Sequence, residues 1–321
     1  MKQYQQWFGN EIMYAWFQDG VQSCINWMDD SLRMDKLEPI SNDVQTGTSL
    51  MDLNDSVFHT IFIIWEILDW FDIAATRKLI ESLNDYFSYY AMQLVTKLEK
   101  ENYYYTPSKP ENSFRPKLLV ALNNLAAIDE SLEFIVGKIE NNSNFQSRSG
   151  TEKNILLVLK EPFPDVRKGI EDISREIVDK ITLNIKNSLS NIRKATNENR
   201  RKKAINHLLY YIENDLNMTY KRLNSTVYKS ILFKLWNEII QILQTSLNEC
   251  KPKIPKFCSM SLCKRKLKTK DLWEISEGCL LIFNANEGLS YSDMKNENYT
   301  KFKSELVYFD LSRKNDKKIS S

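Results

Sequence analysis

Proline and glycine are rare in this sequence and leave a few long stretches uninterrupted. The chain has 321 residues but only eight glycines and eight prolines. The prolines fall at Pro39, within 107–116, within 162–164 and within 252–255. Because proline breaks the interior of a helix and glycine destabilises it, the stretches between these places favour helix. No alternating strand pattern bounded by turn residues competes, so the sequence predicts an all-α fold.

Apolar side chains recur every three or four residues in these stretches, as they do on the buried face of a helix. The clearest case is the isoleucine-rich stripe of 170–192, which steps along one long helix. Residues 208–223 and 228–247 carry two stripes around a polar break at Asn224, so we expect an antiparallel helical hairpin there. Further helices are expected at about 5–33, 52–71, 76–99, 118–139, 270–284 and 296–311.

The charge and the cysteines exclude several classes of protein. The formal net charge is +2 at pH 7, so no overall positive field indicates binding to nucleic acid. The five cysteines are odd in number and scattered, which favours a reducing compartment over a disulfide framework. The most apolar stretch, 57–71, is too short and too charged to span a membrane, and the N-terminus lacks a signal-peptide pattern. We expect a soluble protein or one that lies peripherally on a surface.

Residue types used in catalysis and metal binding are scarce. The only histidines are His59 and His207, so a multi-histidine metal site is excluded, and His59 lies in an apolar stretch typical of a packed side chain. Cys250, Cys258 and Cys263 lack the usual spacing of zinc ligands, and free cysteines are the simpler interpretation. No glycine-rich phosphate loop or nucleophile elbow occurs. We expect no enzyme activity, no metal and no cofactor.

The segment 251–270 is strongly basic. It reads KPKIPKFCSMSLCKRKLKTK, with eight basic residues and no acidic one. Apolar side chains lie between the charges, a composition suited to contact with anionic lipid headgroups or an acidic protein face. A solvated loop between two helices is the simpler interpretation, and the sequence leaves both open. The candidate contact residues are Lys264, Arg265, Lys266, Lys268 and Lys270.

Four segments together indicate a family. They are LRMDKLEPISNDVQTGTSLMDLNDSVFHTIFIIWEIL at 32–68, LLVALNNLAAIDESLEFI at 118–135, LLYYIENDLNMTYKRLNSTVYKSILFKLWNEIIQIL at 208–243 and LLIFNANEGLSYSDM at 280–294. The first two resemble the first Munc-homology region of the Munc-thirteen (Unc-thirteen) vesicle-priming proteins. The third resembles the second Munc-homology region. The fourth is similar to the closing Phe-His-Ala-x-Gly-x-Gly-Leu element of that family.

Particular residues carry the resemblance, and others depart from it. Asn123 and Asn124 stand where the first region has a pair of asparagines, and Leu235-Trp236 matches a Leu-Trp pair of the second region. Asn284 replaces the histidine of the closing element, and Asn286-Glu287 replaces its first glycine. The form DKLEP at 35–39 is most similar to the branch that contains the brain-angiogenesis-inhibitor-associated relative and the haematopoietic paralogue.

The resemblance covers about 5–311 and implies the C-terminal half of a MUN domain. Such a domain is an elongated stack of antiparallel helical bundles, related to vesicle-tethering subunits. The C1 and C2 modules of the family and the N-terminal half of its rod have no counterpart in this sequence, which is either a fragment or a diverged short protein. The expected parts are the first Munc-homology region at 1–148, a connecting helix at 149–198, the second region at 199–312 and a disordered tail at 313–321.

The resemblance also implies a function based on binding. The family binds SNARE proteins, both syntaxin and the assembled SNARE bundle, and promotes the opening of syntaxin so that SNARE complexes assemble during exocytosis. The expected location is the cytoplasm, at the surface of a vesicle or of the plasma membrane. The alternative is a structural vesicle-tethering subunit that does not open syntaxin. The resemblance assigns the syntaxin contact to no particular residue.

Overall fold

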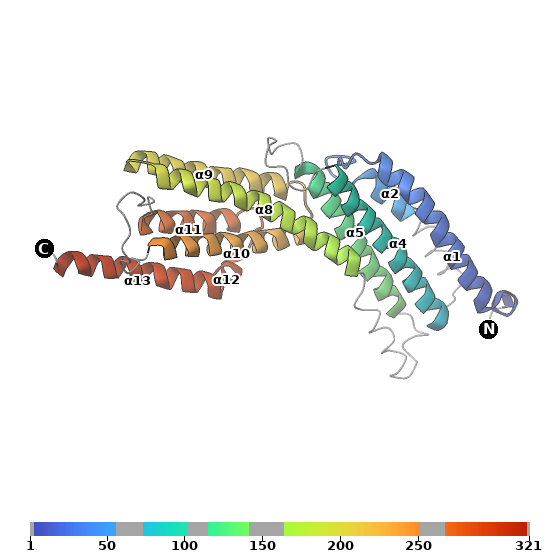
Figure 1. The fold of residues 1–321 in the computed structure, drawn as a ribbon. Helices are drawn as coiled ribbons and strands as arrows, with labels where there is room; N and C mark the ends of the chain where they lie inside the picture. The colour runs from blue at the N-terminus through green and yellow to red at the C-terminus, as the bar shows by residue number, and fades with distance from the viewer. Residues whose placement is uncertain (1–2, 56–72, 102–114, 141–163, 251–266, 320–321) are drawn as a thin grey trace, which may run out of the picture. The chain divides into compact units, whose positions relative to one another are not determined.

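The computed structural model describes residues 3–55, 73–101, 115–140, 164–250 and 267–319, and every regular element in these ranges is an α-helix. The predicted all-α class is therefore confirmed (Figure 1). None of the described helices is long and apolar enough to cross a membrane. The helices are α1 (Gln3–Met34), α2 (Thr48–Asn54), α4 (Ile73–Lys100), α5 (Arg115–Glu140), α8 (Pro164–Lys194), α9 (Glu198–Tyr220), α10 (Ser225–Cys250), α11 (Thr269–Asn284), α12 (Tyr291–Met294) and α13 (Glu297–Ile319).

Most helices lie where the spacing of apolar residues predicts them, and three places differ. Most of the helix expected at 52–71 lies outside the described residues, although α2 begins ahead of it, at Thr48. A single helical turn, α12, precedes α13 and carries no stripe long enough to be detected. Helix α13 continues to Ile319, further than the expected end near 311 and into the stretch expected to be a disordered tail.

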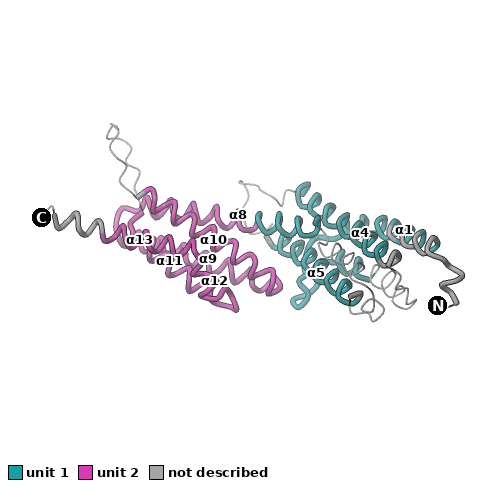
Figure 2. Tube along the Cα trace, turned by 90° about the horizontal axis from the view of Figure 1, so that it is seen from below, with its two compact units in different colours: residues 1–176 teal, residues 177–321 magenta. Residues whose placement is uncertain are grey.

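The chain forms two compact units, shown in different colours in Figure 2. Unit 1 comprises Met1–Glu176 and unit 2 comprises Ile177–Ser321. The division falls inside α8, which contributes its first part to unit 1 and its second part to unit 2. The isoleucine-rich stripe of α8 is buried in both parts, at Ile173, Ile177, Ile181, Ile185 and Ile192.

In unit 1 the helices α1 and α4 pack along each other and run in the same direction. Tyr89 OH donates to Asp29 Oδ1 at 3.0 Å, and further along both helices Lys97 Nζ donates to the carbonyl oxygen of Leu32 at 2.7 Å. Helix α2 is held against α1 by a hydrogen bond from Ser31 Oγ to Asp52 Oδ2 at 2.8 Å. The core is made of leucines and aromatic rings of α4 and α5, among them Leu79, Leu83, Phe87, Leu94, Leu118, Leu122 and Leu125.

In unit 2 the two helices of the expected hairpin are present, but they find different main partners. The break lies at 221–224, and Asn224 Oδ1 accepts a hydrogen bond from the backbone N–H of Val227 at 2.8 Å, which caps α10. Helix α9 packs chiefly on α11, whereas α10 packs on α11 and α13. Adjacency in the sequence therefore predicts the turn between two helices better than it predicts which helices share a core.

The core of unit 2 is organised around Trp236. This side chain is fully buried, and its indole Nε1 donates to the carbonyl oxygen of Met294 at 2.9 Å. The rings of Phe283 and Tyr299 lie with their centroids 5.5 Å and 5.6 Å from it. One residue of α10 thus links α11, α12 and α13 by ring contacts and a hydrogen bond.

Candidate functional site

The basic segment predicted as a contact surface is described only at its end. Residues 264–266 lie outside the described residues, so the prediction for them stays a prediction. Lys268 precedes α11 and Lys270 lies in its first turn, and both are exposed. The Nζ of Lys270 lies 3.2 Å from Glu198 Oε1 at the start of α9. The structure therefore brings the end of this segment beside the first turn of another helix.

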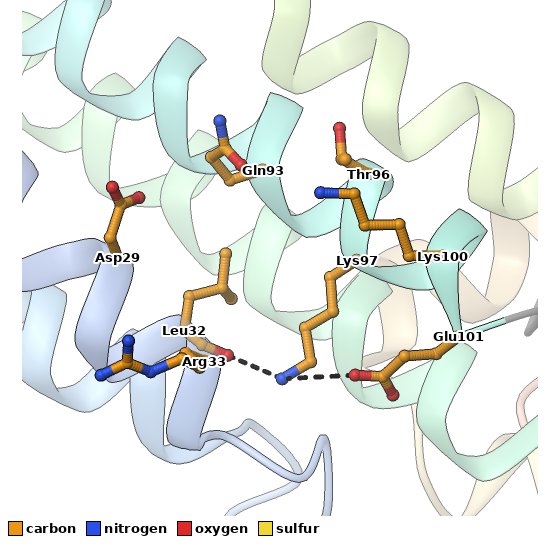
Figure 3. A pocket seen from close by; sticks show the side chains of 8 residues that line it. All are labelled: Asp29, Leu32, Arg33, Gln93, Thr96, Lys97, Lys100 and Glu101. Atoms are coloured by element: carbon orange, nitrogen blue, oxygen red, sulfur yellow. Dashed lines mark hydrogen bonds and ion pairs between the residues drawn. The ribbon is translucent and has the colours of Figure 1, made fainter.

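A surface groove lies between α1 and α4 in unit 1 (Figure 3). Its volume is about 340 Å³. Seven of its eight lining residues have polar side chains, three of them cationic and two anionic, so the groove has a mixed charge, and the stems of these side chains add apolar surface. The lining residues are Asp29, Leu32, Arg33, Gln93, Thr96, Lys97, Lys100 and Glu101.

Lys97 forms the floor of the groove and has a structural role there. Its Nζ donates to the backbone carbonyls of Leu32 and Asp35, at the end of α1. It also lies 3.9 Å from Glu101 Oε1, and Figure 3 shows its contacts with Leu32 and Glu101. The last carbonyls of a helix have no partner within the helix, and a cation satisfies both their hydrogen-bonding capacity and the helix dipole. Lys97 is therefore committed to holding α1 on α4, and the other cations of the groove remain at its surface.

The rim of the groove carries exposed charges that a partner can reach. Arg33 forms an ion pair with Asp30 at 2.6 Å, and both side chains are more than half exposed. Burial, together with the hydrogen bond and the negative charge of Asp29, raises the pKa of Tyr89 above its usual value. Because exposed ion pairs contribute little to stability, the rim charges are available to a ligand at small cost.

A buried polar network lies beside the groove and joins the loop after α1 to α4 and α5. Asp35 Oδ1 accepts from the backbone N–H of Leu37 at 2.7 Å, and Asp35 Oδ2 accepts from the N–H and Oγ of Ser49 at 3.0 and 2.6 Å. Ser49 Oγ and Tyr90 OH lie 2.9 Å apart, and Asn124 Nδ2 donates to Tyr90 OH at 3.0 Å. Burial raises the pKa of Tyr90 well above its usual value. The network is satisfied at every link, which is typical of a structural role.

Gly47 completes this network at a position where a Cβ would displace the Asp35 carboxylate. Its backbone N–H donates to Asn124 Oδ1 at 2.8 Å, and a Cβ at this position would collide with the Asp35 carboxylate. Gly47 precedes α2 and has no side chain to cap it, so the Asp35 carboxylate accepts from the N–H of Ser49 in its place. The loop after α1 and helix α5, which lie far apart in the chain, thus meet in one buried contact.

Residues 285–290 form a tight turn between α11 and α12. Asn286 and Glu287 have φ angles of 52° and 56°, in the left-handed region that favours glycine. A Cβ at Gly288 would collide with the carbonyl oxygen of Phe283. Asn284 Nδ2 donates to the carbonyl oxygen of Leu289 at 2.9 Å, which fixes the two ends of the turn. The Asn284 side chain therefore stabilises the turn.

The described residues contain little that suits catalysis. None of their His, Cys, Asp and Glu side chains gather in groups of three or more that could hold a metal ion. His207 is exposed on α9, and His59 lies outside the described residues. Cys279 is a buried free thiol, and burial raises its pKa to about 12, which leaves it protonated and a poor nucleophile.

The comparisons with known proteins give no family: no protein-family model matches the chain, and no curated protein matches its sequence. A functional interpretation therefore rests on the residues described above and on the resemblance in the sequence. Sequence reasoning missed the groove, because its lining comes from two helices more than 50 residues apart in the chain. The sequence pattern includes Asn124, but nothing in it indicates the hydrogen-bond partners of that side chain.

Proposed function

We propose that this chain is a non-enzymatic module that binds SNARE helices and promotes the assembly of SNARE complexes. The observation that carries the proposal is the contact between segments 32–68 and 118–135. Each resembles the Munc-thirteen family separately, and Asp35 of the first is linked to Asn124 of the second through Ser49 and Tyr90. Residues that hold a fold together are expected to persist in a diverged member of a family.

The closing element supports the same proposal. The family pattern has a glycine where this chain has Asn286-Glu287, and both residues adopt positive φ angles. Asparagine tolerates the left-handed region better than most residues, so the replacement keeps the backbone conformation that glycine favours. The sequence departs from the pattern there, while the turn that the pattern favours is retained.

We place the partner helix in the groove between α1 and α4. The groove is open and lined by side chains of both charges, which suits the polar face of a helix with alternating acidic and basic residues. Arg33 and Lys100 are exposed cations on opposite sides of it, one from each helix. A module of this kind acts through a difference in affinity: it favours open syntaxin only as far as it binds the open form more tightly than the closed form.

The test is a binding titration with purified syntaxin and with the assembled SNARE bundle. The groove variant is Arg33→Gln with Lys100→Gln. The matched control is Arg77→Gln with Lys168→Gln, which also removes one ion-paired arginine and one exposed lysine from unit 1. We expect about tenfold weaker binding for the groove variant and less than a twofold change for the control, since rim charges contribute modestly to affinity.

Two outcomes would overturn parts of this proposal. Equal losses in the two variants would remove the groove as the binding site. No binding of the folded protein to any SNARE, together with co-purification of large tethering proteins, would favour the alternative of a structural tethering subunit.

A further inference from the structure

The first turns of α9 and α11 are fastened to each other by a buried ion pair. Arg201 Nη1 lies 2.8 Å from Asp271 Oδ2, and these side chains are only 12% and 7% exposed. Asp271 Oδ2 also accepts from the backbone N–H of Lys268 at 2.9 Å. Two stretches of unit 2 that are 70 residues apart in the chain therefore lie side by side.

This contact assembles a basic surface that neither stretch has alone. Residues 200–203 read RRKK, a run of four basic residues, and Arg201 is its inward member. The other three are exposed, as are the two lysines at the start of α11. We call these five the basic end surface: Arg200, Lys202, Lys203, Lys268 and Lys270.

The positive charge of this surface is compensated in part. Glu198 pairs with Lys270 at 3.2 Å, and Asp310 accepts a hydrogen bond from Thr269, between Lys268 and Lys270, at 3.3 Å. A hydrogen bond from Lys270 and the charges of Lys270 and Lys268 lower the pKa of Glu198 below its usual value. Arg200, Lys202, Lys203 and Lys268 form no ion pair with any residue that the structure describes.

The composition of the surface favours a lipid partner over a protein partner. Four of the five cations are lysines, which are depleted in the cores of protein–protein interfaces and act as hydrated point charges. An anionic bilayer attracts such charges without requiring a fixed geometry. Trp273, one turn along α11 from Lys270, is 44% exposed, and the Nζ of Lys303 lies 3.3 Å from the centroid of its ring. Leu311 is also exposed, and it follows Asp310, which accepts from Thr269 Oγ1 at 3.3 Å. Tryptophan is enriched at membrane–water interfaces.

We propose that the basic end surface of unit 2 docks on membranes rich in anionic phospholipids. The lysine and arginine heads contact the lipid headgroups. The inference goes beyond the proposed SNARE binding, because vesicles without SNARE proteins are sufficient to observe it. It also extends the sequence prediction for 264–270, since it adds a run of basic residues on α9 that lies far away in the chain.

The experiment is co-sedimentation of the full chain with vesicles of phosphatidylcholine alone or with about 30% phosphatidylserine. The test variant is Lys202→Gln with Lys203→Gln, and Arg201 is kept because it holds the two helices together. The matched control is Lys221→Gln with Lys229→Gln, which removes two exposed lysines near the turn between α9 and α10, away from the first turn of α9. Circular dichroism confirms that each variant is folded.

We expect binding to the anionic vesicles only, weaker by about fivefold for each cation removed and so about 25-fold for the test variant. The control variant keeps binding within about threefold. Equal binding to neutral vesicles, equal losses in both variants, or no sedimentation of the folded wild-type chain with anionic vesicles would each overturn the proposal. Binding to soluble polyglutamate but not to vesicles would assign the surface to an acidic protein instead.

Discussion

The two units join their helices by different chemistry. Unit 1 fastens the loop after α1 to α4 and α5 through hydrogen bonds around the buried Asp35, whereas unit 2 gathers α10, α11, α12 and α13 around the indole of Trp236. An apolar core loses more stability the larger the volume that a substitution removes. A buried polar network depends on the match of donors and acceptors, so a change of one atom is enough to disturb it. The same all-α architecture therefore has two kinds of weak point.

The largest effect is expected in unit 2. Replacing Trp236 with alanine removes a fully buried ring that contacts Phe283 and Tyr299, and we expect a loss of about 3–5 kcal/mol in the free energy of unfolding. Urea unfolding followed by circular dichroism measures it. The control is Trp273→Ala, which removes a 44% exposed indole and its contact with Lys303 and should cost about 1 kcal/mol. Similar losses in the two variants would contradict the role given to Trp236.

In unit 1 a nearly isosteric change should have an effect of comparable size. Both oxygens of Asp35 accept hydrogen bonds from N–H or O–H groups, so Asp35→Asn places an amide donor against a donor whichever way it is turned. We expect a loss of about 2–3 kcal/mol, measured in the same way. Asp30→Asn, at an exposed position, should cost less than about 0.5 kcal/mol. If Asp35→Asn were neutral, the network would not be what holds unit 1 together.

Removal of one oxygen from the same network gives a smaller effect. Tyr90→Phe keeps the buried ring but deletes the hydroxyl that lies between Ser49 Oγ and Asn124 Nδ2. We expect a loss of about 1–1.5 kcal/mol, because two polar groups lose a partner in a buried place. The exposed Tyr210→Phe serves as the control. An unchanged urea midpoint for Tyr90→Phe would show that Ser49 and Asn124 find other partners.

The smallest expected effect is on the free energy of unfolding at alkaline pH, through a tyrosine of unit 2. Burial, with a lesser contribution from Tyr220, raises the pKa of Tyr228 to about 12, whereas an unfolded tyrosine titrates near 10. The folded chain therefore keeps this proton where the unfolded chain releases it, so the contribution is complete below pH 10 and falls between pH 10 and 12. The free energy of unfolding, measured by urea denaturation across this range, should fall less steeply in Tyr228→Phe. The difference in this fall should reach about 1 kcal/mol at pH 11. Identical slopes in the two proteins would rule this out.

The sequence predicts the helices well because their signal is local. The stripe of 170–192 and the break at Asn224 can be read from spacing alone, and both are found. Pairing of helices is different, because it depends on which faces fit in three dimensions. The hairpin interpretation of 208–247 located the turn, but α9 packs chiefly on α11. No local pattern indicates that choice.

The candidate sites could be predicted only in part, for the same reason. Composition identified the basic segment ending at Lys270, but the ion pair of Arg201 with Asp271 joins residues 70 positions apart and has no sequence signature. The run at 200–203 is visible as four successive basic residues, yet its spacing gives no hint of the second helix beside it. The need for glycine at Gly47 could not be predicted either, because only the neighbouring Asp35 carboxylate explains why a Cβ has no room there.

The most direct test of the proposed function is the rate of SNARE complex assembly from syntaxin in its closed form. The chain is added to closed syntaxin and its SNARE partners, and assembly is followed by fluorescence transfer between labelled helices. We predict faster assembly with the wild-type chain and a loss of that acceleration in Arg33→Gln with Lys100→Gln, while syntaxin that is already open assembles at an unchanged rate. An assembly rate from closed syntaxin that does not respond to the folded chain would contradict the account.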